Sequence, residues 1–234
     1  MAYTQDSLIG YDTIKYKEKI KELVKIEKKD DMILDENLRV HSYLNSNSSY
    51  TYLKINLPRN ITSTYRTEEI VSWAYWIGVG EESSQSYAKN METTRNIAQG
   101  MASTFGSPLA GLAIGAVTQL AIPTQGDDVT YAFISNFENV QAFLNGQTYY
   151  QFKNGKGTAA YGKQDSPLQG SFFIGLHNDN ATVGIDVNVK IVVIKEIKTY
   201  EDKEYERKKI NPKYTTLNKK RMVIKKRNIM VNSN

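Results

Sequence analysis

The stretch that decides the fold reads Ser72-Trp73-Ala74-Tyr75-Trp76-Ile77-Gly78-Val79-Gly80, and it contains both tryptophans of the chain. An uninterrupted aromatic and aliphatic run of this length is typical of a β-strand that is covered on both faces, because successive side chains of a strand point to opposite sides. The glycine at its end favours a break in the strand. The run therefore predicts a central strand with a layer of protein on each side.

Two helical segments are expected directly after this strand, as an insertion at about 81–121. Residues 81–100 are polar and helix-prone, and Pro108 then begins an apolar run of small residues that reaches Ile122. Proline suits the first turn of a helix. Gly111 and Gly115 form a small-residue face, which lets a helix lie close against a sheet or, in a bilayer, against another helix. The run is shorter than the ~20 residues that a membrane-spanning helix needs.

The rest of the central region indicates β-structure. Residues 38–44 and 50–57 alternate in polarity around a polar connector and predict a hairpin. A second hairpin is expected from Phe172 to Ile194, where Val183 begins a long alternating strand and the apolar end at 192–194 should be covered twice. Residues 154–157 are expected to form a glycine-rich turn, and residues 159–169 a loop.

An N-terminal helix is predicted at about 14–29, after an arm at residues 1–11. It would carry a narrow apolar stripe that includes Tyr16, Ile20 and Leu23. Two interpretations stay open: a solvated helix on its own domain, or a helix that docks onto a neighbouring subunit.

The positive charge of the chain is concentrated at its C-terminal end. The formal net charge is +5, and residues 207–234 hold ten Lys and Arg and no acid, so the rest of the chain carries −5. Residues 200–209 are compatible with a helix, which Pro212 would end. This basic arm could contact an acidic face of a neighbouring subunit or bind phosphates. Its candidate contact residues are Arg207, Lys208, Lys209, Lys219, Lys220, Arg221, Lys225, Lys226 and Arg227.

No pattern in the sequence points to catalysis. There is no cysteine, and the two histidines, His41 and His177, are far apart in the sequence and lack metal-ligand spacing. The run 178–180 offers oxygen atoms for calcium but has alanine where a third ligand would follow. We therefore expect a protein that is not an enzyme and that holds neither a cofactor nor a metal.

These features predict a mainly β protein: an antiparallel β-sandwich with a two-helix insertion, an N-terminal helix and a basic C-terminal arm. The expected divisions are 1–34 for the N-terminal arm and helix, 35–198 for the sandwich, and 199–234 for the basic arm. Many tyrosines, 16 in all, suit half-buried strand and interface positions.

The Trp76-Ile77-Gly78-Val79-Gly80 strand, the small-residue helix and the Phe-Phe-Ile-Gly-Leu-His-Asn-Asp-Asn segment at 172–180 together resemble virion proteins of tailed phages of the crAss-like group. The abundance of Lys, Asn, Ile and Tyr in this chain is a further point of resemblance to those proteins. The resemblance covers about 71–195 and transfers no functional residue. It implies a structural subunit of a tail, neck or capsid, found in the virion after assembly in the host cytoplasm.

The function that we expect is therefore structural: a subunit that forms a homo-oligomeric ring or lattice with other virion proteins, its terminal segments reaching neighbours. The alternative is a lipid-binding or membrane-active β-sandwich that uses residues 108–122 and the basic tail. Nucleic-acid binding through the tail ranks third. The sequence leaves copy number and symmetry open.

Overall fold

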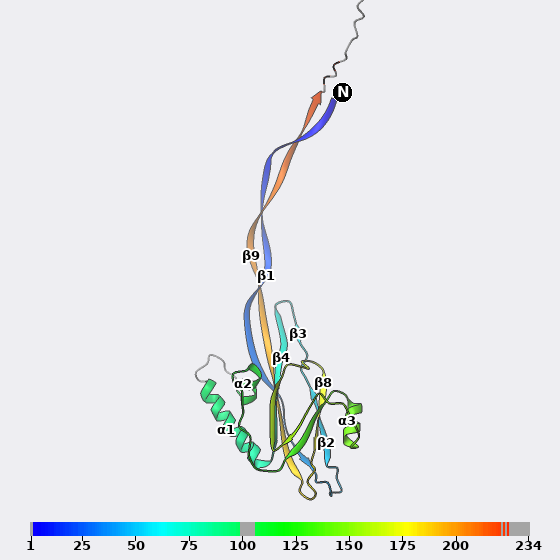
Figure 1. The fold of residues 1–234 in the computed structure, drawn as a ribbon. Helices are drawn as coiled ribbons and strands as arrows, with labels where there is room; N and C mark the ends of the chain where they lie inside the picture. Colours follow the sequence, from blue (N-terminus) through cyan, green and yellow to red (C-terminus); the bar gives the residue numbers. More distant parts are fainter. Residues whose placement is uncertain (1, 99–105, 221, 223, 225–234) are drawn as a thin grey trace, which may run out of the picture. The chain divides into compact units, whose positions relative to one another are not determined.

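The computed structural model describes residues 2–98, 106–220, 222 and 224, which are mainly β and form two antiparallel sheets, as predicted. Contacts divide the chain into two units. Residues 23–200 make up the two-sheet unit, and residues 1–22 with 201–234 make up the ribbon unit. Strands β1 (Ala2–Val40) and β9 (Ile185–Lys220) belong to both units (Figure 1).

The two sheets of the two-sheet unit have different strand orders. The first sheet has the order β1-β9-β4-β3, with β7 paired to β4, and the second has the order β2-β8-β5-β6. The strands not yet given bounds are β2 (Tyr50–Asn56), β3 (Ile61–Thr62), β4 (Arg66–Val79), β5 (Val129–Ile134), β6 (Lys153–Gly157), β7 (Ala159–Gln164) and β8 (Ser171–His177).

Strand β4 is central to the first sheet and is buried on both faces, as its sequence predicted. Trp73 and Tyr75 lie in the core between the sheets, where Trp73 stacks on Phe172 of β8 with 5.0 Å between ring centroids. Trp76 belongs to a separate cluster on the outer side of the sheet. All three side chains of β4 are at most 1% exposed. The predicted double cover at 192–194 is also confirmed, because Val193 packs in the inner cluster and its two neighbours in the outer one.

Helices cover the outer face of each sheet (Figure 1). Helix α1 (Gly80–Ala98) and helix α2 (Pro108–Ile114) lie against the first sheet, where Leu109 of α2 packs with Trp76. Helix α3 (Phe137–Leu144) covers the second sheet and packs Phe143 against it. Apolar side chains thus fill three layers: between the sheets, and outside each of them.

Neither predicted hairpin exists. Residues 38–40 end strand β1 of the first sheet, whereas 50–56 form β2 of the second, where β2 pairs with β8. Strands β8 and β9, predicted to pair with each other, also lie in different sheets. The connectors carry turn chemistry in both cases, but they cross from one sheet to the other. Crossing lets the apolar faces of both strands share one core.

Two shorter assignments were also wrong. Residues 154–157 lie in strand β6, and 159–164 form strand β7, which pairs with β4 from Trp73 to Gly78. Glycines had suggested a turn, but Gly155 and Gly162 lie where an added Cβ would meet the rings of Tyr131 and Tyr75 within 3.0 Å. A residue without a side chain is needed there so that a tyrosine can lie across the strand.

The predicted apolar helix at 108–122 stops at Ile114. Ser107 caps its start, since its hydroxyl accepts a hydrogen bond from the Ala110 amide. Gly115 adopts a left-handed conformation with φ 80° and ends it. Gly111 leaves room for Val117, whose Cγ2 would lie 2.9 Å from an added Cβ. The small residues therefore let the chain fold back on this short helix.

The predicted N-terminal helix is wrong, and residues 200–209, which are compatible with a helix, do not form one either. Residues 14–29 lie in strand β1 and residues 200–209 in strand β9. Lysine and glutamate favour a helix locally, but here the two segments pair as strands, which satisfies their backbone groups across a sequence separation of nearly the whole chain.

High pH should destabilise the two-sheet unit through Tyr75. Burial raises the pKa of its hydroxyl well above the usual value, and neighbouring Tyr131 raises it further. Above pH ~10 the unfolded chain loses this proton while the folded chain keeps it, so the free energy of unfolding falls as pH rises, by up to ~1.4 kcal/mol per pH unit. Below pH ~10 the contribution is fully present.

Denaturant titrations of the wild type and Tyr75→Phe at pH 8 to 11 test this expectation. The variant should lose less stability between pH 10 and 11 than the wild type. Identical losses in the two proteins would contradict the assignment to Tyr75.

Candidate interaction surface

Polar contacts between β1 and β9 connect the two strands of the ribbon unit. Lys17 Nζ lies 2.6 Å from Glu204 Oε1, and Arg207 Nε lies 3.0 Å from Glu18 Oε2. Further contacts join Lys203 to Glu22 at 3.1 Å, Lys213 to Asp12 at 3.8 Å, Thr216 to Asp6 at 2.9 Å and Lys219 to Gln5 at 2.8 Å. From Gln5 to Glu22 along β1, the partners run from Lys219 back to Lys203 along β9, as antiparallel pairing requires; the neighbours Lys17 and Glu18 alone reverse this order.

Glu22 contacts two residues of β9, Tyr205 and Lys203. The Tyr205 hydroxyl donates to Glu22 Oε1 at 2.5 Å, and this bond lowers the pKa of Glu22, with Lys203 lowering it further. The same hydrogen bond raises the pKa of Tyr205. Tyr205 is exposed and Glu22 is half-buried at the surface, so solvent screens the pair and it contributes little to stability.

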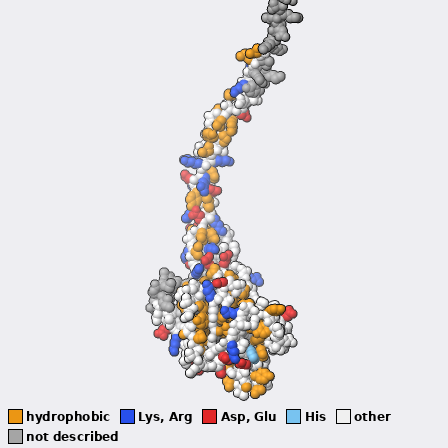
Figure 2. Space-filling view, viewed as in Figure 1, with side chains coloured by type: hydrophobic (Ala, Val, Ile, Leu, Met, Phe, Trp, Pro, Cys, Tyr) orange, Lys and Arg blue, Asp and Glu red, His pale blue; other side chains and the backbone are white. Residues whose placement is uncertain are grey.

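Large apolar side chains are exposed on both strands of the ribbon unit, among acidic and basic ones (Figure 2). Tyr11 is 63% exposed, Ile210 63% and Tyr214 59%. Within the described residues, none of the three hydrophobic clusters includes a residue of this unit. The other exposed apolar residues of the unit are Leu8, Ile9, Ile14, Tyr16, Tyr205 and Leu217, with Met222 and Ile224 beyond the strand.

The predicted stripe of Tyr16, Ile20 and Leu23 does not form one face. Residues at helical spacing were expected to line up, but on a strand only positions separated by an even number share a face. Tyr16 and Ile20 lie in the ribbon unit, whereas Leu23 belongs to the two-sheet unit. Tyr16 and Leu23 are each 46% exposed, and Ile20 is half-buried.

The predicted basic contact residues divide into three groups. Arg207 and Lys219 bind partners on β1 of the same chain. Lys208, Lys209 and Lys220 are exposed and have no ion pair or hydrogen bond within the described residues. The remaining four, Arg221, Lys225, Lys226 and Arg227, lie outside the described residues.

Several of the exposed apolar residues on the ribbon unit were not predicted, although the sequence contains a pattern that indicates them. From Ile14 to Glu22 the sequence reads Ile-Lys-Tyr-Lys-Glu-Lys-Ile-Lys-Glu, with lysine at every second position. This alternation is typical of a strand. The contacts agree with a strand. The neighbours Lys17 and Glu18 contact Glu204 and Arg207, which are an odd number of positions apart on β9 and therefore also lie on opposite faces of the strand.

A groove of about 850 Å³ lies between α1 and the first sheet of the two-sheet unit. On its floor Lys190 Nζ lies 2.5 Å from Asp35 Oδ1 and 5.2 Å from the centre of the Tyr87 ring. Burial raises the pKa of Asp35, but hydrogen bonds from Lys190 and Asn188 outweigh it, so the pKa lies below its usual value. The arrangement ties β1 to β9 beneath the helix.

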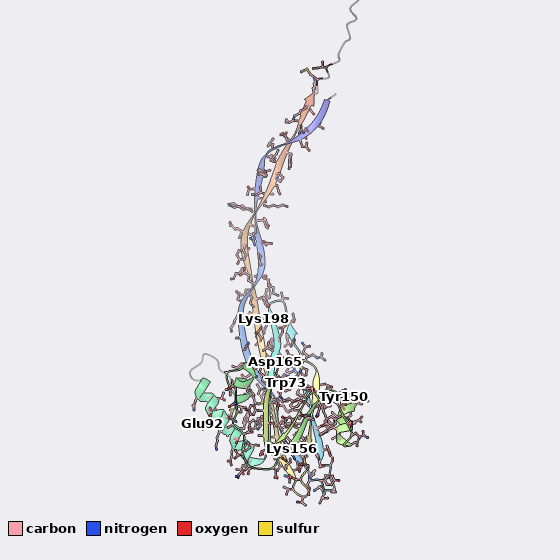
Figure 3. The ribbon with its side chains drawn as sticks, viewed as in Figure 1. Trp73, Glu92, Tyr150, Lys156, Asp165 and Lys198 are labelled. Carbon is pink, nitrogen blue, oxygen red and sulfur yellow. The ribbon has the colours of Figure 1, made fainter. Side chains whose placement is uncertain are left out.

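Acidic side chains at one end of the second sheet are paired with a lysine of strand β6. Lys156, labelled in Figure 3, has its Nζ 2.6 Å from Asp179 and 3.5 Å from Asp128, so this one lysine offsets the charge of both carboxylates. His177 stacks on Tyr50, and burial lowers its pKa. Within the described residues no group of three or more acids or histidines is arranged to hold a metal.

The apolar side chains of α2, the first half of the segment that the membrane-active alternative requires for insertion, lie inside the protein, whereas Ile122 at its end is 49% exposed. Leu109, Ala110 and Ala113 of α2 are at most 1% exposed. None of the described helices combines the length and apolar character needed to cross a membrane.

The chain matches no protein family, no curated protein and no solved structure with which it was compared.

Proposed function

We propose that this protein is a non-enzymatic structural subunit that assembles with copies of itself through the ribbon unit. In this proposal residues 23–200 form a β-sandwich with a helical insertion, and the paired terminal segments supply the contacts. The observation that carries the proposal is the set of exposed apolar side chains on both strands of the ribbon unit, such as Tyr11, Ile210 and Tyr214.

A two-stranded ribbon is marginally stable in water unless another layer covers it. The cross-strand ion pairs add little, because exposed pairs contribute about 0–1 kcal/mol each. Burying the apolar side chains would contribute far more, at roughly 25 cal/mol per Å² removed from water. Exposed apolar groups rimmed by charges are characteristic of protein interaction sites. Covering by a second ribbon therefore supports both association and the fold of the ribbon itself.

The viral setting rests on the sequence resemblance alone. It places the assembly in the tail, neck or capsid of a tailed phage, made in the host cytoplasm and carried in the virion. Other virion proteins would then be further partners. The buried position of α2 removes the main support for the membrane-active alternative, which relied on residues 108–122 being free to insert.

Three substitutions on the ribbon unit test the proposal in the full-length protein. Tyr11→Ser, Ile210→Ser and Tyr214→Ser together should lower the mass of a defined oligomer, measured in solution by light scattering over a range of concentrations. Their side chains are already exposed in the single chain, so their loss removes no core contact.

A matched control carries Tyr43→Ser, Leu44→Ser and Tyr150→Ser, whose side chains are 71%, 69% and 84% exposed on the two-sheet unit. This control should keep the wild-type mass. Near-ultraviolet circular dichroism of Trp73 and Trp76 checks that the two-sheet unit stays folded in both variants. A wild-type monomer at every concentration, or an unchanged mass in the ribbon variant, would overturn the proposal.

A further inference from the structure

The β9 segment of the ribbon unit has its charges separated along its length. Acidic residues dominate 201–206, and from Arg207 to Lys220 every charged residue is basic. The acidic part consists of Glu201, Asp202, Glu204 and Glu206 with one lysine among them. A strand with this order is complementary in charge to a copy of itself that runs in the opposite direction.

Contacts within the chain satisfy only some of these charges. Glu204 binds Lys17, and Arg207 binds Glu18. Glu206, Lys208 and Lys209, which surround Arg207, are exposed and make no ion pair or hydrogen bond within the part of the chain that the structure describes. The unmatched acid and the unmatched bases thus lie on either side of one residue.

The β9 strand of the ribbon unit also has a free edge. Its pairing with β4 ends at Thr199, opposite Arg66, and from 201 onward β1 is its partner within the described residues. A strand paired on one side presents unpaired N–H and C=O groups on the other, which can pair with another strand.

We propose that β9 pairs along this free edge with β9 of a second copy, antiparallel, about a two-fold axis close to Arg207. The inference rests on the proposed function, which it deepens by naming the partner surface. Antiparallel pairing about this axis places Glu206 opposite Lys208 of the second copy, and Lys208 opposite its Glu206. Parallel pairing in register would instead place each charge opposite its own copy, and like charges directly opposite destabilise a sheet.

Pro212 sets one limit of this pairing. Proline has no amide hydrogen and is tolerated on edge strands where its nitrogen faces outward. The intermolecular ladder is therefore confined to residues on the Arg207 side of Pro212. By the two-fold symmetry, Pro212 of the second copy limits the ladder at its other end, at the same distance from the axis. A two-fold contact is closed, so it joins two copies and no more. A ring or lattice needs a second contact, for which the exposed side chains of Tyr11 and Tyr214 remain available.

Single cysteines test the geometry cleanly, because the chain has no cysteine of its own. Full-length variants carry one cysteine at each position from Glu204 to Ile210, with Asn218→Cys, at an exposed position of β9, as a distant control. Under mild oxidation, disulfide-linked dimers are quantified on non-reducing gels. For each position away from the two-fold axis, the same residue in the two copies lies about 6.6 Å further apart along the strands, twice the ~3.3 Å rise per residue. A disulfide needs Cα atoms within about 7 Å of each other.

The expected result is a single maximum of dimer formation at the position on the axis, Arg207→Cys or a direct neighbour, falling at least tenfold by Ile210→Cys and Asn218→Cys. Dimers that recur along the whole series would show parallel association and overturn the inference, while leaving the structural function standing. An oligomeric wild type with no cross-linking in any cysteine variant would likewise overturn the inference alone. A wild type that is monomeric by light scattering would overturn both.

Discussion

Trp73→Ala is expected to lower the free energy of unfolding of the two-sheet unit by about 3–5 kcal/mol, the usual cost of removing a large buried aromatic side chain. Trp73 is fully buried between the sheets, and its ring stacks on Phe172 and lies 6.0 Å from Phe133. Its indole Nε1 donates a hydrogen bond to the Pro167 carbonyl at 2.7 Å. The substitution therefore leaves both a cavity and an unpaired acceptor.

Urea titration followed by far-ultraviolet circular dichroism measures the change. Tyr150→Ala is the control, because Tyr150 is 84% exposed and lies at the periphery near α3 (Figure 3), so its loss should cost no more than about 0.5 kcal/mol. Trp73→Phe separates the two effects, since it keeps part of the packing and loses the hydrogen bond. Equal costs for Trp73→Ala and Tyr150→Ala would contradict the shared core.

Gly175→Ala is expected to cost about 1–3 kcal/mol, although it adds a single methyl group. Its Cβ would lie 2.6 Å from Phe143 Cε1 and 2.9 Å from two other ring atoms. Phe143 is buried between α3 and the second sheet, so the ring cannot swing into solvent without moving the helix. The backbone of Gly175 is not left-handed, and the cost is therefore steric.

Gly184→Ala serves as the matched control, because its Cβ would meet only the guanidinium end of Arg39, a flexible group at the surface. This variant should be nearly neutral. In a background with Phe143→Leu, the cost of Gly175→Ala should shrink, which a double-mutant cycle measures as a coupling energy. An unchanged cost in that background would show that the strain has another source.

Side-chain character along the chain was enough to predict how deeply strands are buried. The run around Trp73 to Val79 is apolar at every position, and it is buried on both faces. Val183 to Ile191 alternates, and from Ile185 on its apolar residues are buried in one core, whereas Val192 to Ile194 is covered twice. Burial follows from local chemistry, because each side chain is partitioned between water and the interior according to its own polarity.

Pairing partners could not be read in the same way. The connector 178–184 has the residues of a tight turn, yet it carries the chain from the second sheet to the first. Alternation shows that one face of a strand meets a core, but it contains no information about which strand lies alongside. The hairpins were predicted because neighbours in sequence are the commonest partners, and here a core shared by both sheets made crossing more favourable.

The terminal segments illustrate the strongest tertiary effect. Lysine and glutamate at 14–29 and 200–209 favour a helix in isolation. In the ribbon unit the two segments pair with each other instead, and Glu18, Glu22 and Asp12 meet basic residues near 203–213. The candidate interaction surface was therefore foreseen in its location at the chain ends, but not in its residues, since the faces of a strand differ from those of a helix.

The sequence by itself determined that the protein is mainly β, that β4 lies at the centre of a core, and that the charge is concentrated toward one end. Those properties depend on composition and on the spacing of side chains along a few residues. Only the tertiary structure decided which strands pair, that the apolar run at 108–122 is a short buried helix, and that the two ends form a ribbon. These depend on contacts between residues far apart in sequence, and the free energy of such contacts belongs to the pair of segments, not to either one alone.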